Sequence, residues 1–208
     1  SLLVIFTTDY KPRSSKRGGA WMNNIREQYI DADGQDVRPI IVNVCNFSGD
    51  ELTIEAFAHQ IAFNLIPHID YFEDNAYTHE EMKMFREGRK ILGVPDLMVN
   101  CTCVRVPVYR SHSESITIET ERPLTPDKAR EILATAPGVK VVDDPENKVY
   151  PMPVDTSNQD LIWVGRVRED ISSTGNGLTF WCAGDQIRKG AALNAVQIAE
   201  KLLELELL

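Results

Sequence analysis

The stretch Cys101–Glu119, CTCVRVPVYRSHSESITIE, decides how this chain is expected to fold. Three valines alternate with Arg105 and a proline, which is the period-2 pattern of a half-buried strand and puts Arg105 on the face opposite the valines. After a break at Tyr109–Ser111, His112 opens a second alternating run. The pattern predicts two strands. If they are neighbours in a hairpin, the Arg105 guanidinium and the His112 imidazole can approach one site.

These two side chains suit a small acidic ligand. Arginine can grip a carboxylate or phosphate through two parallel hydrogen bonds, and histidine can accept and donate a proton near neutral pH. The same pattern is typical of an ordinary strand with one solvated arginine and one surface histidine, and on the pattern alone that interpretation is favoured.

The composition is that of an ordinary globular protein. The chain has 208 residues, 43% hydrophobic and 25% charged, which suits one domain or a tight pair of subdomains. Its formal net charge of −9 disfavours binding to nucleic acid or to an anionic membrane. No apolar run reaches the ~18 residues that a transmembrane helix needs, and the apolar start Ser1–Phe6 is too short for a signal peptide. Four cysteines without a CxxC motif predict no metal site and fit a reducing cytoplasm.

Helix and strand signals follow one another irregularly. Strands are expected over residues 2–6, 38–44, 139–142, 160–168 and 178–183, and helices over residues 20–30, 78–92, 124–136 and 190–207. Thr78 and Glu81 form a capping-box pattern. An Asn-Gly turn at 176–177 predicts that the last two strands form a hairpin or meander. Adjacent strands with helices set apart predict an α+β domain with a largely antiparallel sheet. The chain has no GxGxxG motif, so a doubly wound dinucleotide-binding fold is not expected.

Glu80 and Lys83 lie three residues apart in the expected helix at 78–92, so they share one face. The favoured interpretation from spacing alone is a surface ion pair of small energy. The alternative is an acid and a base presented together to a ligand.

Several segments, taken in order, resemble the aspartate-semialdehyde dehydrogenase family. They are EEMKM (80–84), CVRVPV (103–108), HSES (112–115), APGVKVVDDPENKVYPMPVD (136–155), VGRVREDIS (164–172) and DQIRKGAALNAVQIAE (185–200). The resemblance covers the C-terminal domain of that family, from about Ile61 to Glu200. It implies an α+β fold with a mostly antiparallel or mixed sheet and helices on one face, like the C-terminal domain of the glyceraldehyde-phosphate dehydrogenase group.

The resemblance also implies an activity. It is the reversible, NADPH-dependent reductive dephosphorylation of aspartyl phosphate to aspartate semialdehyde, in the synthesis of lysine, methionine and threonine. NADP would be bound mainly by an N-terminal domain outside this chain. The 208 residues would form a single catalytic and dimerisation domain, and the protein would be a homodimer or homotetramer that binds neither nucleic acid nor membrane.

The resemblance assigns roles to five residues. Arg105 would hold the substrate carboxylate, and His112 would be the acid/base residue. Lys83 would help to bind phosphate, and Glu80 would meet the substrate amino group. Gln186 falls where the family places an amide side chain near the nicotinamide.

The chain departs from the family pattern in three ways. The family's nucleophilic cysteine is expected upstream of this chain, so Cys101, although it lies in an Asn-Cys-Thr run, is interpreted as a buried structural thiol. The dinucleotide-binding domain of the family is expected outside these 208 residues. Lys11 stands where the family has a glutamine, and residues 1–50 are a divergent start. The alternative hypothesis is therefore a catalytically inactive relative that serves as a dimerisation or ligand-binding scaffold.

Overall fold

The computed structural model describes residues 3–7, 57–61, 63–173 and 175–207, with only the backbone for 3–7. The chain divides into two compact units, one formed by residues 1–8 and 65–208 and the other by residues 9–64. The elements named below all belong to the first unit. The expected helix at 20–30, the expected strand at 38–44 and the interpretation of Lys11 lie outside the described residues.

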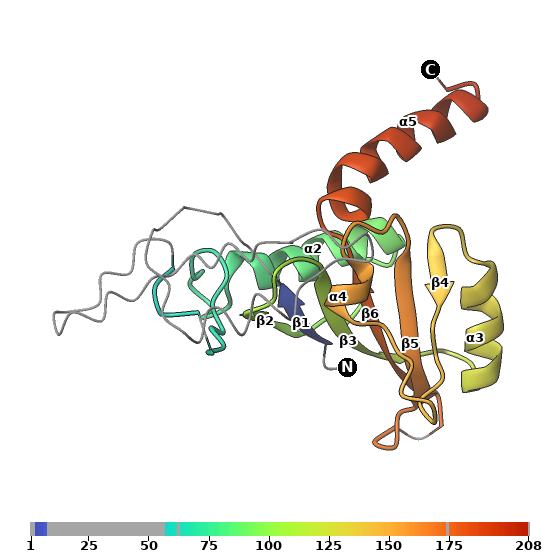
Figure 1. Cartoon of the computed structure of the whole chain (residues 1–208), viewed down its shortest axis with the longest axis horizontal. Coiled ribbons are helices and arrows are strands. Elements are labelled where there is room, and N and C mark those ends of the chain that lie inside the picture. The colour runs from blue at the N-terminus through green and yellow to red at the C-terminus, as the bar shows by residue number, and fades with distance from the viewer. Residues whose placement is uncertain (1–2, 8–56, 62, 174, 208) are drawn as a thin grey trace, which may run out of the picture. The chain divides into compact units, whose positions relative to one another are not determined.

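A mixed sheet of six strands, in the order β2-β1-β3-β6-β5-β4, forms the centre of the described part of this unit (Figure 1). The strands are β1 (Leu3–Thr7), β2 (Cys101–Arg105), β3 (His112–Glu119), β4 (Val139–Val141), β5 (Ile162–Glu169) and β6 (Gly177–Gly184). Two neighbouring pairs, β1–β2 and β4–β5, are parallel, and the other three pairs are antiparallel. The expected α+β class with a mostly antiparallel, mixed sheet is confirmed.

The predicted hairpin between the arginine strand and the histidine strand was wrong. β1 lies between β2 and β3, parallel to the first and antiparallel to the second. The arginine strand also ends earlier than the valine pattern indicated, because β2 stops at Arg105 and the Val108 N–H donates to the Val106 carbonyl (2.9 Å) in a tight turn. Strand order is decided by tertiary packing, so a strand inserted from the start of the chain leaves no local signal in Cys101–Glu119.

The described α-helices are α2 (His79–Leu92), α3 (Pro126–Thr135), the short α4 (Pro153–Thr156) and α5 (Leu193–Glu204). Three of them begin and end close to where the sequence predicts, and the short α4 was not expected. Thr78 caps α2 with the predicted capping box, and Gly93 ends it in the left-handed conformation (φ 66°). The last helix differs in its first turn, η1 (Arg188–Ala192), which is π-helical, and α5 extends away from the sheet (Figure 1). No described helix is long and apolar enough to cross a lipid bilayer.

The strand register shows that the two longer sheet-packing helices, α2 and α3, cover the same face. One row of paired residues crosses the sheet from Cys103 through Ile5, Glu114 and Cys182 to Val164. At one end of this row Cys103 belongs to a cluster with Met84 of α2, and at the other end Val164 and Cys182 pack with Ala129 of α3. Paired residues of adjacent strands point to the same side, so the expected placement of these helices on one face is confirmed.

Candidate functional site

Arg105 and His112 lie at the same end of the sheet although their strands are not neighbours. Arg105, the last residue of β2, pairs with Thr7, the last residue of β1. β1 runs antiparallel to β3 with Phe6 opposite Ser113, so one further step of the same register sets Thr7 beside His112. The two side chains therefore point to the face covered by α2 and α3, two strand spacings or about 10 Å apart at the backbone. Both can reach one small ligand at this sheet end.

Gln186 joins His112 at this end. His112 pairs with Gly184, the last residue of β6, and Gln186 follows two residues later. The Gln186 Oε1 accepts a hydrogen bond from the Ser111 N–H (2.8 Å), directly before the histidine. Ser111 is fully buried with a φ of 83°, and its hydroxyl contacts the Thr156 hydroxyl at 2.5 Å. The residue that precedes the histidine is thus held from two sides.

Asp185 organises the loop that carries Gln186. Its side chain is fully buried, forms an ion pair with Arg110 (Nε–Oδ2 2.7 Å) and accepts hydrogen bonds from three backbone N–H groups, those of Asn158, Ile187 and Arg188. Burial raises the pKa of Asp185, but the Asn158 hydrogen bond, the Arg110 pair and the other two N–H groups outweigh it and lower the pKa below its ordinary value. A charged Asp185 therefore ties the chain before His112 to the chain around Gln186.

Glu81 fastens the helix with Glu80 and Lys83 to the strand with Arg105. One Glu81 oxygen accepts the Thr78 N–H (2.7 Å), which completes the capping box, and the other accepts the Cys103 N–H (2.9 Å). Cys103 lies two residues before Arg105 on β2. The first turn of α2 is therefore anchored beside the strand that ends at the arginine.

Glu80 and Lys83 form the ion pair that their spacing predicts. The Lys83 Nζ donates to Glu80 Oε2 at 3.0 Å, and the side chains are 38% and 23% exposed. The hydrogen bond with Glu80 raises the pKa of Lys83 above its ordinary value. The lysine is thus a cation at neutral pH. Both side chains are exposed enough to break this ion pair and to bind charged groups of a ligand instead.

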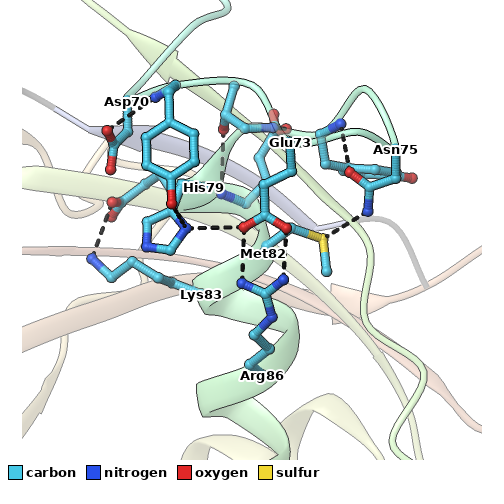
Figure 2. Close-up of polar contacts among 12 residues, drawn as sticks. Asp70, Glu73, Asn75, His79, Met82, Lys83 and Arg86 are labelled. Atoms are coloured by element: carbon cyan, nitrogen blue, oxygen red, sulfur yellow. Dashed lines mark hydrogen bonds and ion pairs between the residues drawn. The ribbon is translucent and has the colours of Figure 1, made fainter.

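The loop before α2 is held against the same helix turns (Figure 2). Glu73 accepts two hydrogen bonds from Arg86 (2.9 and 2.6 Å) and contacts His79 Nδ1 at 2.9 Å. The Tyr71 ring stacks on His79 with centroids 4.8 Å apart. The hydrogen bonds from Arg86 and His79 lower the pKa of Glu73 to about 2. His79 and Lys83 are four residues apart on α2, so this cluster supports the helix face from which the lysine projects.

Cys101 is buried, as predicted. It is 3% exposed, Cys103 is fully buried, and both belong to the small cluster with Ile69 and Met84. The described residues contain no group of three or more His, Cys, Asp or Glu side chains able to hold a metal ion.

The sequence interpretation missed the residues that support this site. Glu81 was recognised only as a cap, while Ser111 and Asp185 were not singled out. Asp185 had a local signal, since an aspartate at a strand end commonly accepts the N–H groups two and three residues later. The bond from Cys103 to Glu81 spans 22 residues and had none.

Comparison with known proteins supplies a family. The family described as "semialdehyde dehydrogenase, dimerisation domain" matches residues 15–189. The aspartate-semialdehyde dehydrogenase of Aquifex aeolicus is 52% identical over 150 residues, which cover 72% of this chain and 44% of that protein. The enzyme of the same name from Campylobacter jejuni is 53% identical over 160 residues, covering 77% and 46%. The chain spans about half the length of the curated relatives that it matches.

Solved structures agree in fold. The structure of aspartate semialdehyde dehydrogenase II from Vibrio cholerae, complexed with ASA, matches with a TM-score of 0.72 and 35% identity over 98% of this chain and 55% of that chain. The structure of aspartate semialdehyde dehydrogenase with NADP from Candida albicans matches with a TM-score of 0.57, covering 100% of this chain and 51% of that chain, but at 18% identity it shows likeness of fold alone.

Proposed function

Since the chain belongs to the aspartate-semialdehyde dehydrogenase family and matches its dimerisation domain, we propose that it is the catalytic and dimerisation half of an enzyme that interconverts aspartyl phosphate and aspartate semialdehyde. The observation that carries this proposal is that Arg105 and His112 lie at the same end of the sheet. The helix turn with Glu80 and Lys83 is anchored to β2, the strand that ends at Arg105, through Glu81. The substrate is an amino acid that carries a phosphate, so its site needs both signs of charge.

Binding of the substrate falls to three side chains. The Arg105 guanidinium holds the α-carboxylate through a planar pair of hydrogen bonds. The Lys83 ammonium receives the phosphate, and the Glu80 carboxylate receives the amino group. Their ion pair holds the two side chains together on α2 before the substrate arrives.

His112 acts on protons. It accepts the proton of a cysteine thiol supplied by the N-terminal part of the enzyme, which makes that sulfur nucleophilic, and it returns a proton to the oxygen of the reacting carbonyl group. Gln186 and Thr156 hold Ser111 in place, and this fixes the backbone position at which the His112 side chain begins.

NADP is the cofactor of the proposed reaction and supplies or accepts the hydride when bound. It is held mainly by the N-terminal part, with Gln186 as the contribution of this chain. An amide side chain can both donate and accept hydrogen bonds, so Gln186 would suit the carboxamide of the nicotinamide. The side-chain amide of Gln186 therefore fits a role in binding NADP.

The protein is proposed to work as a homodimer or larger homo-oligomer, in keeping with the description of its family as a dimerisation domain. An inactive scaffold, the alternative function, is disfavoured because a scaffold has no need of the anchored arrangement of Arg105, His112, Glu80 and Lys83.

Replacing Arg105 tests the proposal. In the full-length enzyme that carries this chain, Arg105→Leu should lower kcat/KM for aspartate semialdehyde by about a hundredfold or more, mainly through KM, because a bidentate carboxylate contact is lost. The measurement is NADP reduction in the presence of aspartate semialdehyde and phosphate.

The matched control is Arg122→Leu, which removes an exposed arginine in the loop between β3 and α3 and should leave the kinetics unchanged. Wild-type kinetics in Arg105→Leu would refute the carboxylate assignment.

A further inference from the structure

The His79 ring is held in one orientation by the loop before α2. It stacks on Tyr71 with the ring planes 17° apart, and its Nδ1 lies 2.9 Å from Glu73 Oε1 and 3.0 Å from the Tyr71 hydroxyl. Glu73 is fixed in turn by two hydrogen bonds from Arg86 (2.9 and 2.6 Å). An ionised carboxylate only accepts hydrogen bonds, so Nδ1 is the nitrogen that carries a hydrogen and donates it to Glu73.

The second ring nitrogen, Nε2, is left for another group. Every hydrogen bond and ion pair that His79 forms with the described residues goes through Nδ1. The side chain is 33% exposed, so a ligand can reach it. A carboxylate that fixes one imidazole nitrogen sets the tautomer of the ring and orients the other nitrogen toward whatever it binds.

Lys83 lies on the side of the ring that carries Nε2. The two residues are four positions apart on α2 and so share one face of the helix. Figure 2 shows the Nδ1 edge of the ring against Glu73 and the opposite edge turned toward the end of the Lys83 side chain. An anion bound at the Lys83 ammonium therefore lies next to His79 Nε2.

Lys83 by itself is a weak match for a phosphate group. Its ammonium is paired with Glu80 at 3.0 Å, and the hydrogen bond from Glu80 and then the charges of Glu87 and Asp70 raise the pKa of Lys83 against the opposing effect of burial. A phosphate group carries a charge of about −1.5 to −2 at neutral pH and three acceptor oxygens. One ammonium surrounded by carboxylates does not balance it, so a second contact is needed.

An imidazole suits this second contact. As an imidazolium it donates from Nε2 to a phosphate oxygen, and as a neutral ring with its hydrogen on Nδ1 it accepts at Nε2 from a P–OH group. It binds the monoanion as well as the dianion of phosphate in this way.

We infer that His79 is a second contact for the phosphate group beside Lys83, made through Nε2, and that Glu73 and Arg86 are positioning residues for the ring. This inference rests on the function proposed above and adds a phosphate-binding residue to it.

Three substitutions in the full-length enzyme separate the two nitrogens of the ring. His79→Phe keeps a ring to stack on Tyr71 and removes both nitrogens, His79→Gln places an amide N–H near the position of Nε2, and His79→Asn places one near the position of Nδ1. We expect the KM for inorganic phosphate to rise roughly tenfold in the Phe and Asn variants, and the Gln variant to stay within about threefold of the wild type, because a hydrogen bond to a charged group is lost in the first two. The KM for aspartate semialdehyde should stay unchanged in all three.

The matched control is Lys90→Gln, which removes an exposed positive charge from the last turn of the same helix and should leave both KM values unchanged. Circular dichroism melting verifies that each variant is folded. Calorimetric titration with inorganic phosphate gives the same comparison for a variant without turnover.

The outcomes distinguish this inference from the proposed function. An unchanged KM for phosphate in His79→Phe overturns the inference, and so does an equal rise in the KM for both substrates. Rescue by Asn rather than by Gln assigns His79 to holding Glu73 and overturns it as well. Lys83→Met serves as the reference: a raised KM for phosphate in this variant, with wild-type values in the His79 variants, overturns the inference alone. Wild-type values in Lys83→Met refute the phosphate role proposed for the lysine together with the inference.

Discussion

At the scale of single residues, Glu81 shows how one side chain serves both a helix and a sheet. It is 7% exposed, and its two oxygens accept one N–H group from the start of α2 and one from the edge strand β2. An edge strand has unpaired N–H groups on its outer side, and a buried one must find an acceptor. The carboxylate therefore stabilises the fold and sets where Glu80 and Lys83 meet the sheet.

Removal of this carboxylate should be measurable in stability. We expect Glu81→Ala to lower the free energy of unfolding by roughly 2–4 kcal/mol, since it removes the capping box and leaves the Cys103 N–H without its acceptor. Urea denaturation of the chain is the measurement. Glu87→Ala, an exposed glutamate on the same helix, should have an effect below about 0.5 kcal/mol, and equal effects of the two substitutions would contradict the role given to Glu81.

Asp185 predicts a pH dependence with a definite sign. Its pKa in the folded chain is lower than the ordinary value of 3.8, so its contribution to stability is complete above the pKa of the unfolded chain and is lost as the pH falls through the folded pKa. We expect Asp185→Asn to be less stable than the wild type at pH 7, and the difference to shrink as the pH falls below 3.8. Urea denaturation across this pH range measures the difference in unfolding free energy, and Asp74→Asn, at an exposed position, is the control. A difference between wild type and Asp185→Asn that stays constant with pH would contradict the assignment.

At the scale of elements, the candidate site is formed by residues at the ends of strands rather than by residues in the middle of the sheet. β2 ends at Arg105, β3 begins at His112 and β6 ends at Gly184, and all three positions lie at the same end of the sheet. Loops at strand ends can carry polar groups, because the hydrophobic core is formed by residues within the strands, such as Val164 and Leu178. Polar residues of the site are therefore held by neighbouring loops, as the Asp185 and Ser111 contacts show.

Two glycines in different elements should respond in opposite directions to alanine. A methyl group on Gly165, in β5, would clash with the Val142 carbonyl oxygen and lie 2.7 Å from Pro151 Cδ, whereas on Gly88, within α2, it would meet nothing within 4 Å. We expect Gly165→Ala to destabilise the fold by roughly 3 kcal/mol or more through overpacking. Gly88→Ala should stabilise it by about 0.5–1 kcal/mol through helix propensity. Thermal melting of both variants checks this pair, and a tolerated Gly165→Ala would show that β4 and β5 can separate.

At the scale of the whole molecule, the chain spans about half the length of its curated relatives, with 44% and 46% of two of them covered. Within the described part lie the groups proposed to hold the substrate and move its proton. The nucleophile and most of the cofactor contacts are assigned to the N-terminal part of the proposed enzyme.

We expect the isolated 208-residue chain to fold but to show no phosphate-dependent dehydrogenase activity. The measurement is NADP reduction with aspartate semialdehyde and phosphate, beside a full-length enzyme as positive control and a circular dichroism spectrum that verifies the fold. Activity in the isolated chain would refute the assignment of the nucleophile to the N-terminal part.

The sequence by itself determined the α+β class, the helix α2 with its cap at Thr78, the antiparallel pairing of β5 with β6, and the presence of an arginine and a histidine on separate strands. These features depend on hydrophobic periodicity, capping and turn chemistry, which act between residues close in the chain. Only the tertiary structure decided that β1 lies between β2 and β3, that Glu81 joins α2 to Cys103, and that the register of β5 against β6 shifts between Gly165 and Arg168. Strand order and long-range hydrogen bonds are set by which buried groups satisfy one another across the folded core, and the local pattern of residues carries no record of that choice.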